Sequence, residues 1–309
     1  MKKRLIFLVS IIFVLIFSII ISEAKFNEVA KKDYPRTNVN IFKDTPVWEL
    51  ALAVKNENTK EIERIVKYKP KLLNYQEPKF GNTLLIWAVG MEKYNSAETL
   101  LKCGADPNIQ SVRYDTYDEE TALSVASQFS WVDRDANEDP KYVKLLLKYG
   151  ANPNWSYIGA EHSTEPGTSI LMNSIGYGIE KTKLLVEAGA DVNHKTKSGE
   201  TAAIIALRMK EIESAYYLIV EKRAIVSEPR YRYMCCEGQN PNDKFYPVDS
   251  LRRWWICDIG SEEYEIKMRI VEEFARQGVN YWETEIPEDV LERIKQIYPE
   301  TWKEYIKKY

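Results

Sequence analysis

The chain has 309 residues, of which 45% are hydrophobic and 29% are charged, a composition typical of a folded protein. Its formal net charge is −3; residues 1–24 carry three basic side chains and one acidic one, so residues 25–309 carry −5. An acidic chain lacks the excess of Lys and Arg that neutralises nucleic-acid phosphates, so we expect no nucleic-acid partner.

The first 24 residues have the pattern of an export signal. Basic residues 2–4 precede an apolar run over residues 5–21, and the small residues Ser22 and Ala24 take the −3 and −1 positions of a cleavage site. We predict cleavage after Ala24. Because the apolar run is almost long enough to span a bilayer, an uncleaved anchor through residues 5–21 is the alternative. Either form is exported, to the periplasm, the cell envelope or the medium, and contacts a membrane only through this segment if it is uncleaved.

A helix end, a glycine turn and a new helix start recur along the rest of the chain. Gly189 suits the left-handed conformation that follows a helix, and Thr201 suits the N-cap of the next helix. The turn, Gly-Ala-Asp/Asn-x-Asn, is found at residues 104–108, 150–154 and 189–193. The predicted N-caps are Thr45, Thr83, Thr121, Ser169 and Thr201. Repeated units of this size predict stacked helix pairs that share one extended core.

With this turn and a Thr-Pro-Leu-like helix start, the chain resembles the ankyrin-repeat family over roughly residues 42–226. The resemblance implies an all-α ankyrin-repeat solenoid with five clear repeats. One departure concerns the histidine that the family usually places three residues after the capping threonine. Those positions here hold Trp48, Ile86, Ser124, Met172 and Ile204. We therefore expect the contacts between neighbouring repeats to be mainly apolar.

Beyond the fifth repeat the pattern weakens. Tyr246-Pro247-Val248 resembles Thr45-Pro46-Val47, which predicts a degenerate sixth repeat, and apolar positions after Pro287 predict a closing helix. Terminal repeats differ because they cover the open end of a stack. The predicted organisation is a signal peptide or N-terminal anchor at 1–24, a linker at 25–43, repeats one to five at 44–226, an irregular insertion with the degenerate repeat at 227–286, and a C-terminal helical cap at 287–309.

Residue types used in catalysis or metal binding do not form a recognisable set. His162 lies beside two flexible carboxylates, Glu161 and Glu165, and such a group is a weak metal site. Residues 133–137 resemble the start of a calcium loop, but Glu138 stands where that loop needs glycine. We therefore predict no catalytic residues, no metal site, no cofactor and no enzyme activity.

The insertion and its surroundings contain three of the four cysteines, Cys235, Cys236 and Cys257. Because an exported protein meets oxidising conditions, Cys257 is expected to pair with Cys235 or Cys236. Arginine and aromatic residues also gather at 230–233 and 252–255, a pattern typical of surfaces that stack single-stranded nucleic acid. We favour the alternative, in which the tryptophans pack the sixth repeat and the arginines reach solvent.

In ankyrin-repeat proteins the first helices and the hairpin loops, or fingers, line a binding groove. The resemblance places the residue four after each N-cap in that groove; here these are Glu49, Trp87, Val125, Asn173 and Ile205. The candidate binding residues are Trp87 and its neighbour Val125, Tyr114 and Tyr117 in the long finger 109–120, and Trp155 and Tyr157 in the long finger 155–168. Rigid aromatic side chains bury much area at little entropic cost and dominate binding hot spots. The alternative is that the finger aromatics fold back onto their own loops.

The resemblance implies a protein-binding module, and the export signal places it outside the cytoplasm. An inhibitor or immunity-type protein that blocks a secreted or envelope enzyme is the alternative, and the long fingers favour it. A third hypothesis, an enzyme with its site in residues 226–246, has no supporting motif. The fold hosts many partners, so the identity of this one does not follow from it.

Overall fold

The computed structural model describes residues 34–112, 114–115, 118–128, 130–132, 138–159, 164–233 and 240–309. These residues form two compact units, Met1–Tyr117 and Asp118–Tyr309, which we call unit 1 and unit 2. The predicted signal at residues 1–24, the calcium-like run 133–137 and the side chains of Tyr117, His162, Cys235 and Cys236 lie outside the described residues. In the part of the chain that is described, no helix is long and apolar enough to cross a membrane.

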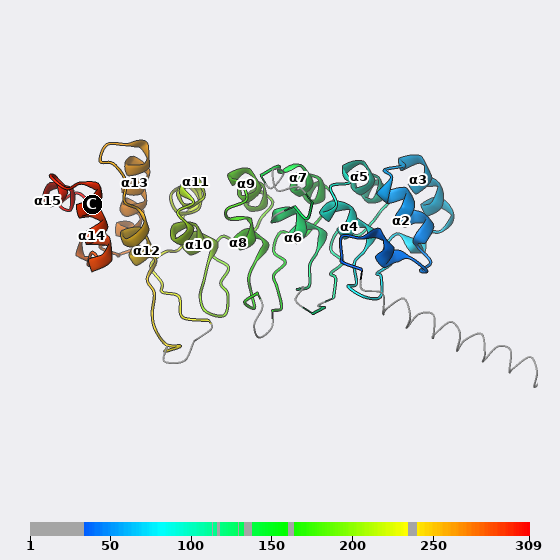
Figure 1. The fold of residues 1–309 in the computed structure, drawn as a ribbon, viewed down its shortest axis with the longest axis horizontal. Coiled ribbons are helices and arrows are strands. Elements are labelled where there is room, and N and C mark those ends of the chain that lie inside the picture. Colours follow the sequence, from blue (N-terminus) through cyan, green and yellow to red (C-terminus); the bar gives the residue numbers. More distant parts are fainter. Residues whose placement is uncertain are drawn as a thin grey trace, which may run out of the picture. The chain divides into compact units, whose positions relative to one another are not determined.

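Unit 1 consists of two helix pairs preceded by a short turn of helix (Figure 1). Its elements are η1 (Val39–Phe42), α2 (Trp48–Lys55), α3 (Thr59–Tyr68), η2 (Pro70–Leu72), α4 (Leu84–Gly90) and α5 (Tyr94–Lys102). Helix α2 packs on α4, and α3 packs on α5. The unit is held by a continuous apolar core that includes the fully buried Phe42, Leu50 and Ile62.

Unit 2 consists of four further helix pairs and a terminal pair of short helices (Figure 1). The four pairs are α6 (Ala122–Ser127) with α7 (Lys141–Lys148), α8 (Ile170–Ser174) with α9 (Ile179–Glu187), α10 (Ala202–Met209) with α11 (Ile212–Tyr216) and its extension η4 (Tyr217–Glu221), and α12 (Pro247–Trp254) with α13 (Glu262–Arg276). The first helices of the pairs pack in one row and the second helices in another, so each repeat buries the face of the one before it.

Serine and threonine N-caps begin the first helices at four of the five predicted positions. The side chains of Thr83, Thr121, Ser169 and Thr201 each accept a hydrogen bond from the backbone N–H three residues later, which confirms those four caps. The prediction for Thr45 is wrong. Its hydroxyl donates to the Phe42 carbonyl oxygen at 2.6 Å, and α2 begins three residues later, at Trp48.

Glycines end the second helices in the predicted conformation. Gly104, Gly150 and Gly189 have φ of 95°, 84° and 93°, values that L side chains rarely adopt, which confirms the turn assignment. Gly278 takes the same conformation, at 81°, after α13. The predicted sixth helix pair therefore closes with the same kind of turn as the earlier ones.

Asparagine side chains join the turns of neighbouring repeats in unit 2. The amide oxygen of Asn154 accepts from Asp191 N–H at 2.8 Å, and its Nδ2 donates to the Gly189 carbonyl at 2.9 Å. Asn193 repeats the arrangement one unit later by accepting from Ile225 N–H at 2.8 Å. Polar contacts of the turn asparagines therefore supplement the apolar packing that the sequence predicts between repeats.

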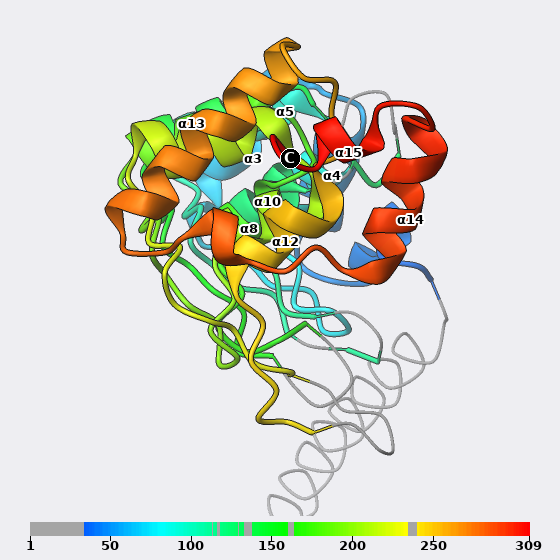
Figure 2. The same cartoon turned by 90° about the vertical axis from the view of Figure 1, so that its left-hand side faces the viewer.

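Helices α14 (Glu288–Ile297) and α15 (Trp302–Tyr305) follow η5 (Tyr281–Glu283) and close the end of unit 2 beyond α12 and α13 (Figure 2). They pack through a buried cluster of Val290, Ile294, Tyr305 and Tyr309. An amphipathic pair in this position covers the apolar face that the last full repeat leaves open.

The arginine–tryptophan run at the end of α12 behaves differently at each position. Trp255 is fully buried and donates from Nε1 to the Leu207 carbonyl at 3.0 Å, whereas Trp254 is exposed. Arg252 does not reach solvent, contrary to expectation. Its Nε donates to the Thr284 carbonyl at 3.1 Å, and its guanidinium lies 4.3 Å from the Tyr281 ring, so it joins α12 to η5.

Cys257 is a free, buried thiol, which differs from the expected bridge to Cys235 or Cys236. The backbone of Cys257 is hydrogen-bonded to Tyr305. The Tyr305 hydroxyl donates to the Cys257 carbonyl at 2.7 Å and accepts from the Cys257 N–H at 3.2 Å. Burial is the main reason that the pKa of this thiol lies above its usual range. The thiol therefore packs as a small apolar side chain within the C-terminal cap.

Candidate functional site

Three loops of unit 2 extend on the same side of its helix rows (Figures 1 and 2). We call them the first finger (residues 155–168), the second finger (residues 194–200) and the third finger (residues 229–246). The first two precede α8 and α10, and the third precedes α12. Because each finger leads into a helix of the same row, regular stacking of that row brings the fingers into contact.

The first finger is a hairpin built around Tyr157. Tyr157 N–H donates to the Thr168 carbonyl, and Gly167 N–H donates to the Tyr157 carbonyl, both at 2.9 Å. The Tyr157 ring lies edge-on to Trp155 with the centroids 4.7 Å apart, and Gln128 Nε2 donates to its hydroxyl at 2.5 Å. Burial raises the pKa of Tyr157 far above its usual value. Tyr157 is thus buried within the finger, as in the alternative in which the finger aromatics fold back onto their own loops, and is not an exposed binding residue as predicted.

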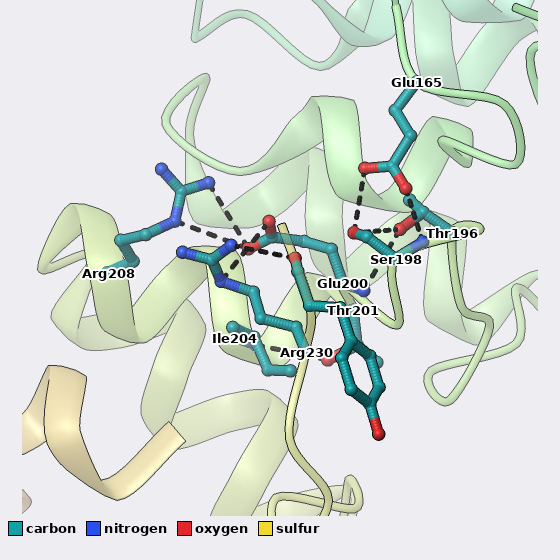
Figure 3. Close-up of polar contacts among 9 residues, drawn as sticks. Glu165, Thr196, Ser198, Glu200, Thr201, Ile204, Arg208 and Arg230 are labelled. Atoms are coloured by element: carbon teal, nitrogen blue, oxygen red, sulfur yellow. Dashed lines mark hydrogen bonds and ion pairs between the residues drawn. The ribbon is translucent and has the colours of Figure 1, made fainter. Parts of the chain in front are cut away.

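Glu165 joins the first finger to the second (Figure 3). Its carboxylate accepts from Ser198 N–H at 2.6 Å and from Ser198 Oγ at 3.1 Å. Close by, Lys197 N–H donates to the Pro166 carbonyl at 3.2 Å. The sequence suggested a flexible carboxylate at position 165, but charge-assisted hydrogen bonds to a neighbouring repeat fix it in place.

The contact between these two fingers also requires glycine at position 167. Gly167 has φ of +85°, and a Cβ atom there would lie 3.2 Å from Thr196 Cα. A side chain would therefore be strained both by the backbone conformation and by the neighbouring finger. The two backbones can approach this closely because residue 167 has no side chain.

The second and third fingers are joined in a similar way (Figure 3). Tyr231 N–H donates to the Ser198 carbonyl at 2.7 Å, so Ser198 contacts both neighbouring fingers. Arg230 pairs with Phe245 across the third finger through two backbone hydrogen bonds of 3.0 and 2.9 Å. Its Nε lies 3.7 Å from Glu200 Oε2, and Arg208 Nη2 lies 3.3 Å from the other oxygen of the same carboxylate.

Two further carboxylates, from the segment just before α6, bind described residues of the first finger on either side of positions 160–163. Glu119 accepts from the N–H groups of Ile158 and Gly159 at 2.6 and 3.2 Å. Asp118 accepts from Thr164 N–H at 3.2 Å and from its hydroxyl. These carboxylates satisfy backbone donors of the first finger that would otherwise be left to water.

Trp87 and Val125 are buried, whereas the sequence pattern predicted that both of them lie in an exposed groove as binding residues. Trp87 is 2% exposed, and its ring lies edge-on to Phe42 with the centroids 6.4 Å apart. Val125 is 4% exposed. All seven residues of α4 are buried, so this short apolar helix has no solvent-facing stripe from which Trp87 could contact a partner.

The other predicted positions have mixed environments. Tyr114 is exposed, and its ring lies edge-on to that of Phe80, in the loop before α4, with the centroids 5.2 Å apart. Trp155, Asn173 and Ile205 are half-buried, and Glu49 is exposed. The described residues include no group of three or more His, Cys, Asp or Glu side chains that could hold a metal ion.

The residues that connect the fingers were not found from the sequence. Glu165, Ser198 and Arg230 lie more than 30 residues apart in successive repeats, and no local pattern links them. One feature of the sequence could have indicated these residues. Each finger carries an acidic or basic residue close to a Pro or Gly, at Glu165-Pro166-Gly167, Ser198-Gly199-Glu200 and Pro229-Arg230.

Comparison with known proteins agrees with this architecture. A family model described as ankyrin repeats (3 copies) matches residues 123–228, and a single ankyrin-repeat model matches residues 80–112. The chain is also similar to an ankyrin repeat protein of Acanthamoeba polyphaga mimivirus, with 33% identity over 125 residues, or 38% of this chain. The aligned region is 17% of that viral protein, so the chain spans only a small part of its length. Residues 80–112 and 123–228 therefore match ankyrin repeats, and the described residues have the all-α fold of an ankyrin-repeat solenoid.

Proposed function

We propose that this chain is a protein-binding module that acts outside the cytoplasm, with its partner bound to the fingers of unit 2. Ankyrin repeats generally mediate protein–protein binding. Stacked repeats present extended surfaces on which several repeats can contact one partner. Beyond this general function, we propose that the partner binds the fingers and that the chain acts outside the cytoplasm.

The observation that carries the proposal is that the three fingers are bonded to one another through Glu165, Ser198 and Tyr231. A surface that is already ordered loses little conformational entropy when a partner binds. The bonded fingers still expose large side chains, with Ile158 of the first finger 70% exposed and Tyr246 of the third finger 42% exposed. Such a rigid surface with exposed apolar groups is suited to a protein partner.

We expect substitution of these exposed side chains to weaken partner binding without unfolding the protein. The test variant combines Ile158→Asp with Tyr246→Ala, and the matched control is Tyr68→Asp, at an exposed residue at the end of α3. The tagged chains are used for affinity capture from an extract of the extracytoplasmic fraction, and the captured protein is then purified for titration. Loss of a hot-spot contact costs about 2 kcal/mol, so the test variant should bind roughly 30-fold more weakly.

The control should bind like the parent chain, and all three chains should have the same melting temperature. A partner that binds the test variant and the parent equally would place the binding surface away from the fingers. Recovery of no stoichiometric partner would contradict the proposed function itself. If the captured partner is an enzyme that loses activity in the complex, the inhibitor or immunity-type function is the correct form of the proposal.

The proposed export rests on residues 1–24, whose basic start, apolar run and small residues match a signal peptide. We expect the protein from its native host to begin at Lys25. N-terminal sequencing of that protein measures this directly. A chain that begins at Met1 in the membrane fraction would support the uncleaved anchor, and a chain that begins at Met1 in the cytosol would contradict export.

A further inference from the structure

A pocket of about 390 Å³ lies between the second and third fingers. Its lining includes Lys197, Ser198, Tyr231, Arg232, Tyr233 and Pro241. Two of these side chains are cationic and none is anionic. The backbone hydrogen bond from Tyr231 to Ser198 holds the two walls together, so the pocket is present before any ligand binds.

Lys197 supplies the first positive charge. Its side chain is exposed, and its ammonium group forms no ion pair or hydrogen bond with any residue in the described ranges. Its backbone is fixed, because Lys197 N–H donates to the Pro166 carbonyl at 3.2 Å. The charge is therefore held at the pocket without a partner of its own.

Arg232 supplies the second positive charge, and the hydrogen-bond donors of its guanidinium are only partly satisfied. Its guanidinium lies 4.9 Å from the Phe245 ring, and an Nη2 atom lies 3.6 Å from Asp243 Oδ2, which is longer than a hydrogen bond. Its Nε is buried and has no hydrogen-bond acceptor among the residues that the structure describes. A buried N–H group without an acceptor costs free energy, which an incoming anion would recover.

The carboxylates near the pocket that belong to described residues do not fill it. Glu165 is engaged by Ser198, and Asp243 is the distant partner of Arg232. Lys244, next in the third finger, is exposed but is not one of the residues that line the pocket. The local field therefore favours an anionic ligand, although the whole chain has a net charge of −3.

We propose that this pocket binds an acidic side chain, aspartate or glutamate, of an extended segment of the partner protein. The inference rests on the proposed function and specifies the chemistry of the partner. A carboxylate would accept from the Arg232 guanidinium and the Lys197 ammonium, as guanidinium and carboxylate groups commonly pair. The volume exceeds that of one carboxylate, and Tyr231, Tyr233 and Pro241 provide surface for the adjoining peptide.

The test uses the full chain and a fluorescein-labelled octapeptide of alternating glutamate and alanine, with its glutamine counterpart as the neutral control. Binding is followed by fluorescence anisotropy at low ionic strength. The glutamate peptide should bind, and the glutamine peptide should bind at least tenfold more weakly. Lys197→Glu should weaken binding of the glutamate peptide at least tenfold, whereas Lys244→Glu, which changes the same charge outside the pocket, should change it less than threefold.

Equal binding of the two peptides, or equal effects of Lys197→Glu and Lys244→Glu, would overturn the proposal. Inorganic phosphate and a single-stranded oligodeoxynucleotide serve as competitors, and displacement of the peptide by either at equal or lower concentration would assign the pocket to free phosphate or to nucleic acid instead. The Lys197 side chain forms no ion pair or hydrogen bond with a described residue, so Lys197→Glu is expected to fold. Its melting temperature checks this.

The two proposals fail in different ways. If the captured partner binds the Lys197→Glu chain normally but is lost from the Ile158→Asp, Tyr246→Ala chain, the pocket assignment is wrong and the module function stands. If no partner is captured, the module function is wrong, and the peptide titration still decides whether the pocket selects carboxylates.

Discussion

Replacing Trp87 by alanine is expected to lower the free energy of unfolding by about 3–5 kcal/mol, the usual cost of removing a large aromatic ring from a core. The ring lies in α4, a helix with no exposed residue, and contacts Phe42 of η1 edge-on. No rearrangement of a seven-residue helix can fill the space that the indole leaves. Urea unfolding followed by circular dichroism measures the loss.

A phenylalanine at position 87 is the matched control. The indole Nε1 of Trp87 is buried and has no hydrogen-bond partner in the described part of the chain, so Trp87→Phe removes some packing but also removes an unsatisfied N–H group. We expect it to cost roughly 1–2 kcal/mol, well below the alanine variant. Hydrogen exchange should locate the effect of alanine in α4 and α5. If Trp87→Ala instead keeps its stability and loses partner binding, the ring belongs to a binding surface and its burial is misjudged.

The sequence was sufficient to predict the helix pairs, because the signals for their ends are local. A threonine cap such as Thr83 acts on a backbone group three residues away, and a glycine such as Gly189 acts on its own φ. Thr45 is the exception because its hydroxyl turns back to Phe42, a contact that precedes the helix. The fold class could therefore be predicted from residues that act within one turn of each other.

The binding surface could not be predicted in the same way, because burial depends on residues that are distant in sequence. Trp87 is covered by Phe42, and Tyr157 is fixed by Gln128. The family pattern places the residue four after each N-cap in a groove, but it does not say whether other side chains cover that residue. The role of Ser198 in joining the fingers likewise depends on Glu165, which lies 33 residues earlier and accepts its hydrogen bond.

Raising the pH from 7 to 9 is expected to increase the free energy of unfolding of the chain by about 2 kcal/mol. The responsible group is Lys267 of α13, whose side chain is fully buried. Its Nζ donates to the Trp255 carbonyl at 3.0 Å and lies 3.7 Å from the centroid of the Tyr309 ring. Burial lowers the pKa of Lys267 from 10.5 to about 7, since the charged form loses its hydration.

The sign of the effect follows from proton uptake. The unfolded chain keeps the lysine protonated up to about pH 10, whereas the folded chain releases the proton near pH 7, so the unfolded state binds more protons between these values. The free energy of unfolding therefore rises with pH in that window. Below pH 7 both states are protonated, and the folded state bears the full cost of a buried charge.

The ionisable groups around Lys267 narrow the pH range over which the free energy of unfolding rises, but they do not change the sign of the effect. Cys257 and Glu263 raise the pKa of Lys267, whereas Arg252 and Lys210 lower it, and all four effects are smaller than that of burial. Burial raises the pKa of the Cys257 thiol and raises that of Tyr281 to about 12. Those groups stay protonated in the folded chain when the unfolded chain ionises, so they destabilise it above about pH 9. The measurement is therefore confined to pH 7–9.

Lys267→Met is the decisive variant, because methionine fills a similar volume without a charge. We expect it to be more stable than the parent chain at pH 7 and to lose the rise between pH 7 and 9, as measured by urea unfolding at each pH. Lys303→Met, at an exposed residue of α15, removes the same charge from the surface and should retain the rise.

If the parent chain shows no rise, Lys267 stays protonated in the folded state, and its contacts with Trp255 and the Tyr309 ring outweigh the loss of hydration. A rise that persists in Lys267→Met would instead assign the proton release to another group.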